Sequence, residues 1–287
     1  MKKSKIKSYC KVNLTLRVLK KLNNGYHSIS SLITFAELCD KISISKTNRT
    51  KDIISFSGRF KKGINKKNNT VSKLLNLLRQ NKMLNKQMFK INIEKNIPHG
   101  SGLGGGSSNA AALLNYLNLK MKMKLSKKKL QVLASKIGFD VPINLEKKNT
   151  FLTGKKNRII RINQNFKLNL LIVYPGIVCS TKKIYENNKK RTSNKRQNLF
   201  KKRGIKNLVN FLKNDDNDLQ KTVIRIYPKI KKIIDFIKLQ NGCYFSRITG
   251  SGSACIGIFS SKKNVIYAQK MIKLKFPRYW SFISKTI

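Results

Sequence analysis

The sequence has few acidic residues and few of the side chains that build metal or disulfide frameworks. Its 287 residues include 11 Asp and Glu, 2 His, 5 Cys and 1 Trp. The cysteines are odd in number and form no C-x-x-C pair, which argues against both a disulfide framework and a zinc ribbon. No run of about 18 apolar residues occurs, and the basic segment 1–14 contains no apolar signal region. We therefore expect a protein of the reducing cytoplasm with no membrane partner.

Positive charge is what the sequence has in excess. There are 63 Lys and Arg, so the formal net charge is +52. Such a charge attracts polyanions, and one interpretation is an RNA-binding protein, which would bind RNA with a strong salt dependence and would not turn over ATP. The basic residues are spread over the whole length rather than clustered, which is typical of solvated faces. We expect no specific nucleic-acid partner, and a polyanionic small molecule fits the same charge.

Apolar periodicity predicts strands alternating with helices, the pattern of an α/β (α+β) fold. Alternation and short apolar runs predict strands at 10–18, 29–38, 89–95, 168–174, 243–248 and 254–259, with two more in 40–57. Spacing of three and four residues predicts helices at 71–80, 205–213, 218–240 and 263–275, one after the glycine-rich segment and one ending at Gly138. A polar, basic stretch suggests a domain boundary near residue 153, and 186–204 has the composition of a solvated loop.

Five glycines, at positions 100, 102, 104, 105 and 106, lie between a predicted strand and a predicted helix. The helix has Ala110, Leu113, Leu114 and Leu117 on one face, and Ser107 or Ser108 is its expected N-cap. Glycines let an anion approach the backbone N–H groups at a helix N-terminus, where the helix dipole adds attraction. The segment therefore predicts a phosphate site, although a flexible glycine turn is the simpler alternative.

Two common phosphate loops do not fit this segment. A Walker A loop needs Lys before Ser or Thr, and Gly106 stands there instead. The spacing of Gly100, Gly102 and Gly105 matches the dinucleotide fingerprint, but the acid expected about 20 residues later is absent, since 120–124 reads KMKMK. The match to the dinucleotide fingerprint is therefore interpreted as coincidental.

Three motifs in order resemble those of the GHMP kinase superfamily, named for galacto-, homoserine, mevalonate and phosphomevalonate kinases. They are CKVNLTL at 10–16, PHGSGLGGGSSNAAALL at 98–114 and ITGSGSACIGIF at 248–259. The resemblance implies a two-domain GHMP kinase fold, with an N-terminal domain at 1–153, a C-terminal α/β sandwich domain at 154–287 and the active site in the cleft between them. It also implies ATP as co-substrate and Mg²⁺ with it, as phosphoryl transfer requires charge neutralisation.

Two further segments, NNGYHSISSLI at 23–33 and GFDVPINL at 138–145, resemble one branch of this superfamily. Members of that branch phosphorylate the 2-hydroxyl of a methylerythritol derivative of cytidine diphosphate, in isoprenoid precursor biosynthesis by the non-mevalonate route, without a covalent enzyme intermediate. Another GHMP kinase acting on a small alcohol is the nearer alternative. The expected partners are small molecules, and the protein is expected to be a monomer or homodimer.

The resemblance assigns roles to individual residues. It implies that Asp140 is the catalytic base and Lys11 the cation beside it, whereas from the sequence alone Asp140 is equally a turn residue and Lys11 one surface lysine among many. No carboxylate cluster is visible that would form a protein metal site. The resemblance implies ATP and phosphate binding by Pro98, His99, Gly100, Ser101, Gly102, Leu103, Gly104, Gly105, Gly106, Ser107 and Ser108. It implies substrate binding by Asn13, Tyr26, His27, Thr181 and Tyr185, and a C-terminal glycine motif at Gly250 and Gly252.

Overall fold

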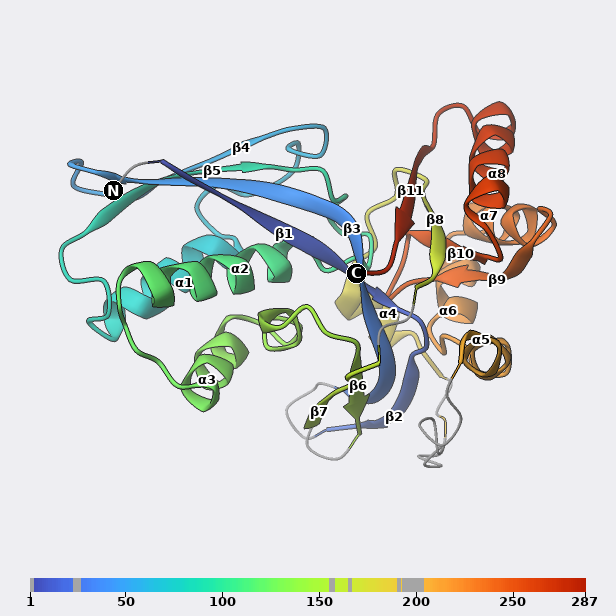
Figure 1. Cartoon of the computed structure of the whole chain (residues 1–287), viewed down its shortest axis with the longest axis horizontal. Coiled ribbons are helices and arrows are strands. Elements are labelled where there is room, and N and C mark those ends of the chain that lie inside the picture. The colour runs from blue at the N-terminus through green and yellow to red at the C-terminus, as the bar shows by residue number, and fades with distance from the viewer. Residues whose placement is uncertain (1–2, 23–26, 155–157, 165–166, 190–191, 193–203) are drawn as a thin grey trace. The chain divides into compact units, whose positions relative to one another are not determined.

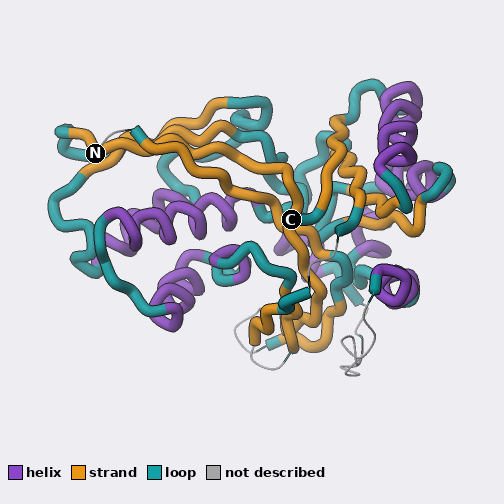
Figure 2. The backbone as a smooth tube through the Cα atoms, viewed as in Figure 1, coloured by secondary structure: helices purple, strands orange, loops and turns teal. Residues whose placement is uncertain are grey.

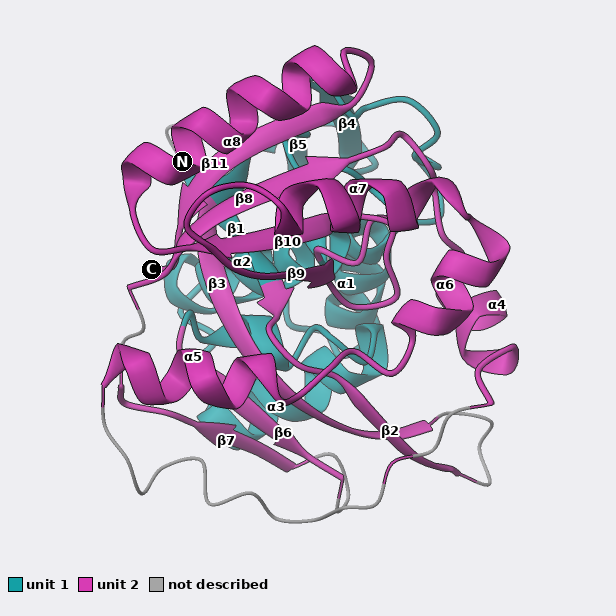
Figure 3. Ribbon diagram, turned by 90° about the vertical axis from the view of Figure 1, so that its right-hand side faces the viewer, with its two compact units in different colours: residues 1–11, 38–99, 104–147 teal, residues 12–37, 100–103, 148–287 magenta. Residues whose placement is uncertain are grey.

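The computed structural model describes residues 3–22, 27–154, 158–164, 167–189, 192 and 204–287. The chain divides into two compact units, distinguished by colour in Figure 3. The first unit comprises 1–11, 38–99 and 104–147, and the second comprises 12–37, 100–103 and 148–287. Each unit therefore contains several separate stretches of chain. The domain boundary expected near residue 153 stays a prediction.

The first unit is a layer of strands covered on one side by helices (Figures 1 and 2). Its elements are β1 (Ser4–Asn13, through residue 11), the second half of β3 (His27–Thr47), β4 (Ile53–Ser57), α1 (Thr70–Gln80), β5 (Met88–Glu94), α2 (Gly105–Lys120), α3 (Lys127–Ile137) and the 3₁₀ helix η1 (Ile143–Leu145). Strand β5 pairs antiparallel with β3 and parallel with β4.

The core of the first unit follows from the periodicity of its sequence. Residues 89, 91 and 93 of β5 point inward and pack against the apolar faces of α1, α2 and α3. Helix α1 begins with a capping box, in which the side chain of Asn69 accepts from the Val71 and Ser72 backbones and Ser72 reciprocates. The predicted helix at 71–80 is confirmed.

The second unit is built around a four-stranded sheet in the order β11-β8-β10-β9, with α7 and α8 packed on it (Figure 3). Its elements are β2 (Arg17–Lys21), the first half of β3, β6 (Thr150–Thr153), β7 (Arg158–Arg161), β8 (Asn169–Tyr174), α4 (Thr181–Glu186), α5 (Ile205–Lys213), α6 (Gln220–Ile226), α7 (Lys229–Lys238), β9 (Cys243–Ile248), β10 (Cys255–Phe259), α8 (Lys262–Lys275) and β11 (Trp280–Lys285). The strands β8, β10 and β11 pair antiparallel.

Several predicted boundaries were wrong. The strand expected at 10–18 ends at Asn13 and resumes at Arg17, because Leu16 exchanges backbone hydrogen bonds with the 216–218 segment. The helix expected at 218–240 is two helices, since Pro228 has no N–H to donate and starts α7. Most of the expected loop 186–204 lies outside the described residues. Among the described residues, no helix is long and apolar enough to cross a membrane.

Candidate active site

Lys11 and Asp140 meet in the first unit. The Lys11 Nζ lies 3.3 Å from the Asp140 Oδ2. Lys11 is near the end of β1, and Asp140 lies in the turn that follows α3, where Asn144 Nδ2 donates to the Asp140 carbonyl at 2.6 Å. The lysine side chain is 6% exposed and the aspartate side chain 33% exposed. The cation is therefore fixed in the protein, and the carboxylate can be reached by a small molecule.

The N-terminus of α2 differs from the prediction. The N-cap is Gly104, in the left-handed region at φ +68°, and not Ser107 or Ser108. No side chain among the described residues caps this helix. The local preference for a serine cap is overridden because Gly104 can adopt a positive φ that a serine rarely adopts, so the helix begins three residues earlier. As a result, backbone N–H groups of the first turn of α2 are not satisfied by a capping side chain.

Glycine at 104 and 105 leaves room for neighbouring side chains. A Cβ built at Gly104 would stand 2.7 Å from the Lys11 Cγ, and one at Gly105 would stand 2.9 Å from the Ile97 Cγ2. The Gly106 carbonyl accepts a hydrogen bond from the Thr70 hydroxyl at 2.7 Å. The glycine segment is therefore packed against its surroundings, which contradicts the alternative of a loose glycine turn.

Residues 100–103 belong to the second unit, where they pack against the turn at 249–254. The Ala254 N–H donates to the Ser101 carbonyl at 3.0 Å, and the Thr249 carbonyl occupies the space that a Cβ on Gly102 would need. A Cβ on Gly250 would in turn stand 2.8 Å from the Gly102 carbonyl oxygen. Two segments far apart in the sequence thus approach backbone to backbone, and a side chain on either glycine would separate them.

The remaining residues of the predicted phosphate loop have different surroundings. Pro98 and Leu103 are buried, and Ser107 is half-buried. His99 Nε2 lies 2.9 Å from the Lys62 carbonyl, which it can reach as a donor. The Ser108 hydroxyl donates to the Tyr9 carbonyl, so it holds α2 to β1.

Asn13, predicted to bind substrate, is buried in the second unit. Its backbone N–H donates to the Thr249 hydroxyl and its Nδ2 donates to the Ser31 hydroxyl, both at 2.8 Å. The Asn217 side chain holds the same turn from another direction, with Nδ2 donating to the Gly250 carbonyl at 2.8 Å. The C-terminal glycine turn is therefore fixed by side-chain amides and a hydroxyl as well as by its strands.

His27 and Tyr185 stack on each other in the second unit, with ring centroids 5.2 Å apart and an interplanar angle of 29°. Thr181, one turn before Tyr185 on α4, has its hydroxyl 3.0 Å from the Ser251 hydroxyl. Tyr26 lies outside the described residues. The structure thus brings His27 beside the tyrosine that the sequence suggests as a second aromatic ring.

The cysteines of the second unit are not poised as nucleophiles. Burial raises the pKa of the Cys179 thiol to about 11, and burial likewise raises the pKa of Cys255, so both are protonated at neutral pH. Among the described residues, no group of three or more His, Cys, Asp or Glu side chains could hold a metal ion.

Sequence reasoning missed two charged residues, Asp40 and Lys95, that lie buried beneath the glycine segment of the first unit. A signal was present, because each occupies an inward position in the alternation of its strand: Asp40 follows Leu38 and precedes Ile42, and Lys95 follows Ile93. A charged side chain at a position where the alternation places apolar residues is rarely buried alone, so it indicates a partner of opposite charge.

Two family models match the chain. They are described as the GHMP kinases N terminal domain, matched at residues 69–146, and the GHMP kinases C terminal, matched at residues 198–277. The chain belongs to the GHMP kinase family. GHMP kinases use ATP as their co-substrate.

Curated relatives are named 4-diphosphocytidyl-2-C-methyl-D-erythritol kinase. The chain is 38% identical to the one from Pelagibacter ubique, over 100% of both chains, and 32% identical to the one from Caldicellulosiruptor bescii, over 94% of each. A crystal structure of 4-(cytidine 5'-diphospho)-2C-methyl-D-erythritol kinase matches with a TM-score of 0.74 at 23% identity, covering 98% of this chain and 99% of the other. The predicted fold class and the predicted resemblance to this branch of the family are confirmed.

Proposed function

We propose that this protein transfers the γ-phosphoryl group of ATP to the 2-hydroxyl of 4-diphosphocytidyl-2-C-methyl-D-erythritol. The observation that carries the proposal is the contact between Lys11 and Asp140 in the unit where Gly104 starts α2 against the Lys11 side chain. A carboxylate, a buried cation and a helix N-terminus without a side-chain cap are the parts that phosphoryl transfer to an alcohol requires. The names of the relatives supply the substrate.

The glycine segment is the proposed phosphate site. Backbone N–H groups at the start of α2 would donate to phosphate oxygens, with the positive end of the helix dipole toward them. Residues 98–108, predicted from the sequence to bind ATP, include those whose side chains hold the segment in place, such as His99 and Ser108. These two act through the shape of the loop in this proposal.

Asp140 is the proposed base. Its carboxylate would accept the proton of the attacking hydroxyl, and Lys11 would orient that carboxylate and supply positive charge next to the transferred group. No enzyme side chain becomes phosphorylated in this scheme, because the hydroxyl attacks the phosphorus directly.

We infer that the cytidine part of the substrate is bound by residues of the second unit. An imidazole edge can hydrogen-bond to a pyrimidine and a phenol ring can stack on one, which suits the neighbouring His27 and Tyr185. Tyr26 is proposed as a further ring. Asn13 and Thr181 are proposed to bind the polar groups of the substrate, and Gly250 and Gly252 to shape the turn beside residues 100–103.

Mg²⁺ is proposed to accompany ATP. The described residues offer no carboxylate cluster, so they fit an ion held chiefly by phosphate oxygens, and the half-buried Ser107 hydroxyl would be its protein ligand. When bound, the ion neutralises phosphate charge. We further propose that the protein acts in the cytoplasm as a monomer or homodimer, on small molecules and without a specific nucleic-acid partner.

The test is formation of ADP by the purified protein, with the cytidylyl substrate and with a matched alcohol that lacks cytidine. We expect turnover with the first and far less with the second. Asp140→Ala should lower kcat at least about 100-fold, because the base is lost, while ATP affinity stays within about twofold. Asp235→Asn, which removes an exposed ion pair with Lys231 on α7, is the control and should behave as wild type. Wild-type turnover in Asp140→Ala would refute the assignment of the base.

A further inference from the structure

Two opposite charges are buried side by side in the first unit, and neither residue is among those assigned to the reaction. The antiparallel register of β3 and β5 pairs Lys41 with Glu94. Asp40 precedes Lys41 in β3, and Lys95 directly follows the end of β5. The Lys41–Glu94 pair is exposed, whereas the Asp40 side chain is 0% exposed and the Lys95 side chain 3% exposed. Strand pairing therefore places this carboxylate and ammonium in contact inside the protein, where a buried charge without partners would be destabilising.

The Asp40 carboxylate accepts hydrogen bonds from four donors in two places in the chain, residues 95–97 and Asn109. Its Oδ2 accepts from the Lys95 ammonium and, at 3.0 Å, from Asn109 Nδ2. Its Oδ1 accepts from the backbone N–H groups of Asn96 and Ile97, each at 2.8 Å. Asn96 and Ile97 lead into the glycine segment, and Asn109 lies in the second turn of α2. One carboxylate thus holds the chain where it enters the segment and the helix that leaves it.

The Lys95 side chain lies against the start of α2. A Cβ built at Gly105 would stand 3.3 Å from the Lys95 Nζ and would also press on Ile97. The first turn of the helix therefore packs against the Lys95 ammonium and against Ile97, whose backbone N–H donates to Asp40. A change in the pair would shift the backbone N–H groups proposed to bind phosphate.

We propose that Asp40 is a positioning residue for ATP: it fixes the glycine segment and α2 relative to each other so that the backbone N–H groups converge on the phosphates. The inference rests on the proposed function. Asp40 touches neither substrate, so its effect is on the geometry of the loop. Loss of that geometry is expected to weaken ATP binding and to leave the binding of the cytidylyl substrate unchanged, because the residues proposed for cytidine belong to the other unit.

Asp52 provides a matched control in the same unit. Its carboxylate also pairs with a cation, Arg79, at 2.8 Å and also accepts from a backbone N–H, that of Phe89, at 2.8 Å. It therefore has the same kinds of bonds as Asp40, and none of them is to the glycine segment or α2. Asp52→Asn measures how far the loss of such a pair changes stability and ATP affinity when the pair has no bond to the glycine segment.

The experiment compares wild type, Asp40→Asn, Asp52→Asn and the double variant Asp40→Leu/Lys95→Met. The double variant replaces the buried pair with apolar side chains and is expected to fold even where Asp40→Asn, which leaves Lys95 buried without its carboxylate, does not. KM for each substrate, kcat and the affinity for a non-hydrolysable ATP analogue are measured, with urea unfolding of each variant.

We expect KM for ATP and the dissociation constant of the analogue to rise at least about tenfold in the folded Asp40 variants, and to stay within about twofold in Asp52→Asn. KM for the cytidylyl substrate should stay within about twofold in all. Analogue affinity within twofold of wild type in the double variant would overturn the inference, as would an equal loss in Asp52→Asn. Failure of wild type to turn over the cytidylyl substrate would instead count against the proposed function, since analogue binding is measured without turnover.

Discussion

Two buried cations, Lys95 of the first unit and Arg247 of the second, are satisfied in different ways. In the first unit the Lys95 ammonium contacts the Asp40 carboxylate. In the second unit the Arg247 guanidinium is bound mainly by backbone carbonyls, and its residue is 4% exposed. An ammonium is a compact charge that needs an opposite charge when buried, whereas a guanidinium spreads its charge over several donors in a fixed plane. The chemistry of the cation thus decides whether a carboxylate must be buried with it.

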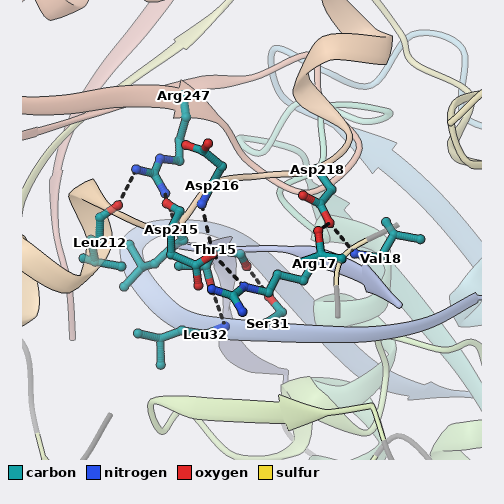
Figure 4. A network of polar contacts seen from close by, with 12 residues as sticks. Thr15, Arg17, Val18, Ser31, Leu32, Leu212, Asp215, Asp216, Asp218 and Arg247 are labelled. Carbon is teal, nitrogen blue, oxygen red and sulfur yellow. Dashed lines mark hydrogen bonds and ion pairs between the residues drawn. The ribbon is translucent and has the colours of Figure 1, made fainter. Parts of the chain in front are cut away.

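Figure 4 shows the contacts of Arg247. Its Nη1 donates to the carbonyls of Leu14, at 3.0 Å, and of Asp215, and its Nη2 donates to the carbonyl of Leu212 at 2.6 Å. Burial lowers the pKa of Arg247 to about 10, and the nearby charges of Asp216 and Asp215 oppose that shift. Arg247 remains charged at neutral pH and ties the end of α5 to the chain after β1.

The largest effect is expected from Arg247→Met. The substitution keeps an apolar stem but leaves three carbonyls without their donor, so the free energy of unfolding should fall by about 3 to 5 kcal/mol. Urea unfolding followed by circular dichroism measures it. A decrease in the free energy of unfolding below about 1 kcal/mol would show that water replaces the guanidinium as donor to the carbonyls. The backbone bonds of Arg247 would then not be what stabilises this buried cation.

Lys95→Met should have a smaller effect. Asp40 loses its ammonium but keeps three N–H donors, from Asn96, Ile97 and Asn109. A carboxylate with several such bonds tolerates burial better than an orphaned charge, so we expect a loss of about 1 to 3 kcal/mol in the same unfolding measurement. A loss larger than that of Arg247→Met would reverse the order that the two environments predict.

The smallest effect concerns pH. The pKa of Cys179 is raised by burial from 9.0 to about 11, so the folded state holds this proton more tightly than the unfolded state does. Its contribution to stability is complete below about pH 9 and is lost as the pH rises through about 11, with about 2 kcal/mol lost by pH 10.5.

Many lysines titrate in the same range, so the quantity to measure is the difference in unfolding free energy between wild type and Cys179→Ala at each pH. That difference should shrink from pH 8.5 to pH 10.5. A difference that stays constant over this range would mean that the thiol titrates alike in both states.

The motifs whose residues lie close together in the sequence were predictable. The glycine segment between β5 and α2 could be read from spacing alone, and so could the helices at 70–80 and 262–275. The pairing of Lys11 with Asp140 needed the family resemblance, because 129 positions separate the two residues and nothing local joins them. Their roles in the reaction stay predictions, as do those of the other proposed site residues.

What the sequence did not reveal depends on strand register and on backbone conformation. Strand β3 runs from His27 to Thr47, although the prediction divides it near Asp40, where a charge interrupts the apolar run. The interruption is the inward-facing carboxylate itself. Its place in the apolar alternation indicated a buried partner, but that the partner is Lys95 follows only from the register of β3 and β5. The start of α2 was also predicted wrongly. Serine is a preferred N-cap residue, which favoured Ser107 and Ser108, whereas the positive φ of Gly104 cannot be predicted from the sequence.

The glycine at the start of α2 sets two requirements against each other. A Ser or Asp at position 104 could bond to the amides of the first turn only if its backbone left φ +68° and Lys11 moved away from its Cβ. It would then occupy the same donors that the proposed phosphate site needs. Selection for a sturdier apoprotein and selection for tighter nucleotide affinity therefore favour different residues at this one position. The first turn of α2 is left without a side-chain cap, and in the proposed function the phosphates of ATP would accept from its N–H groups.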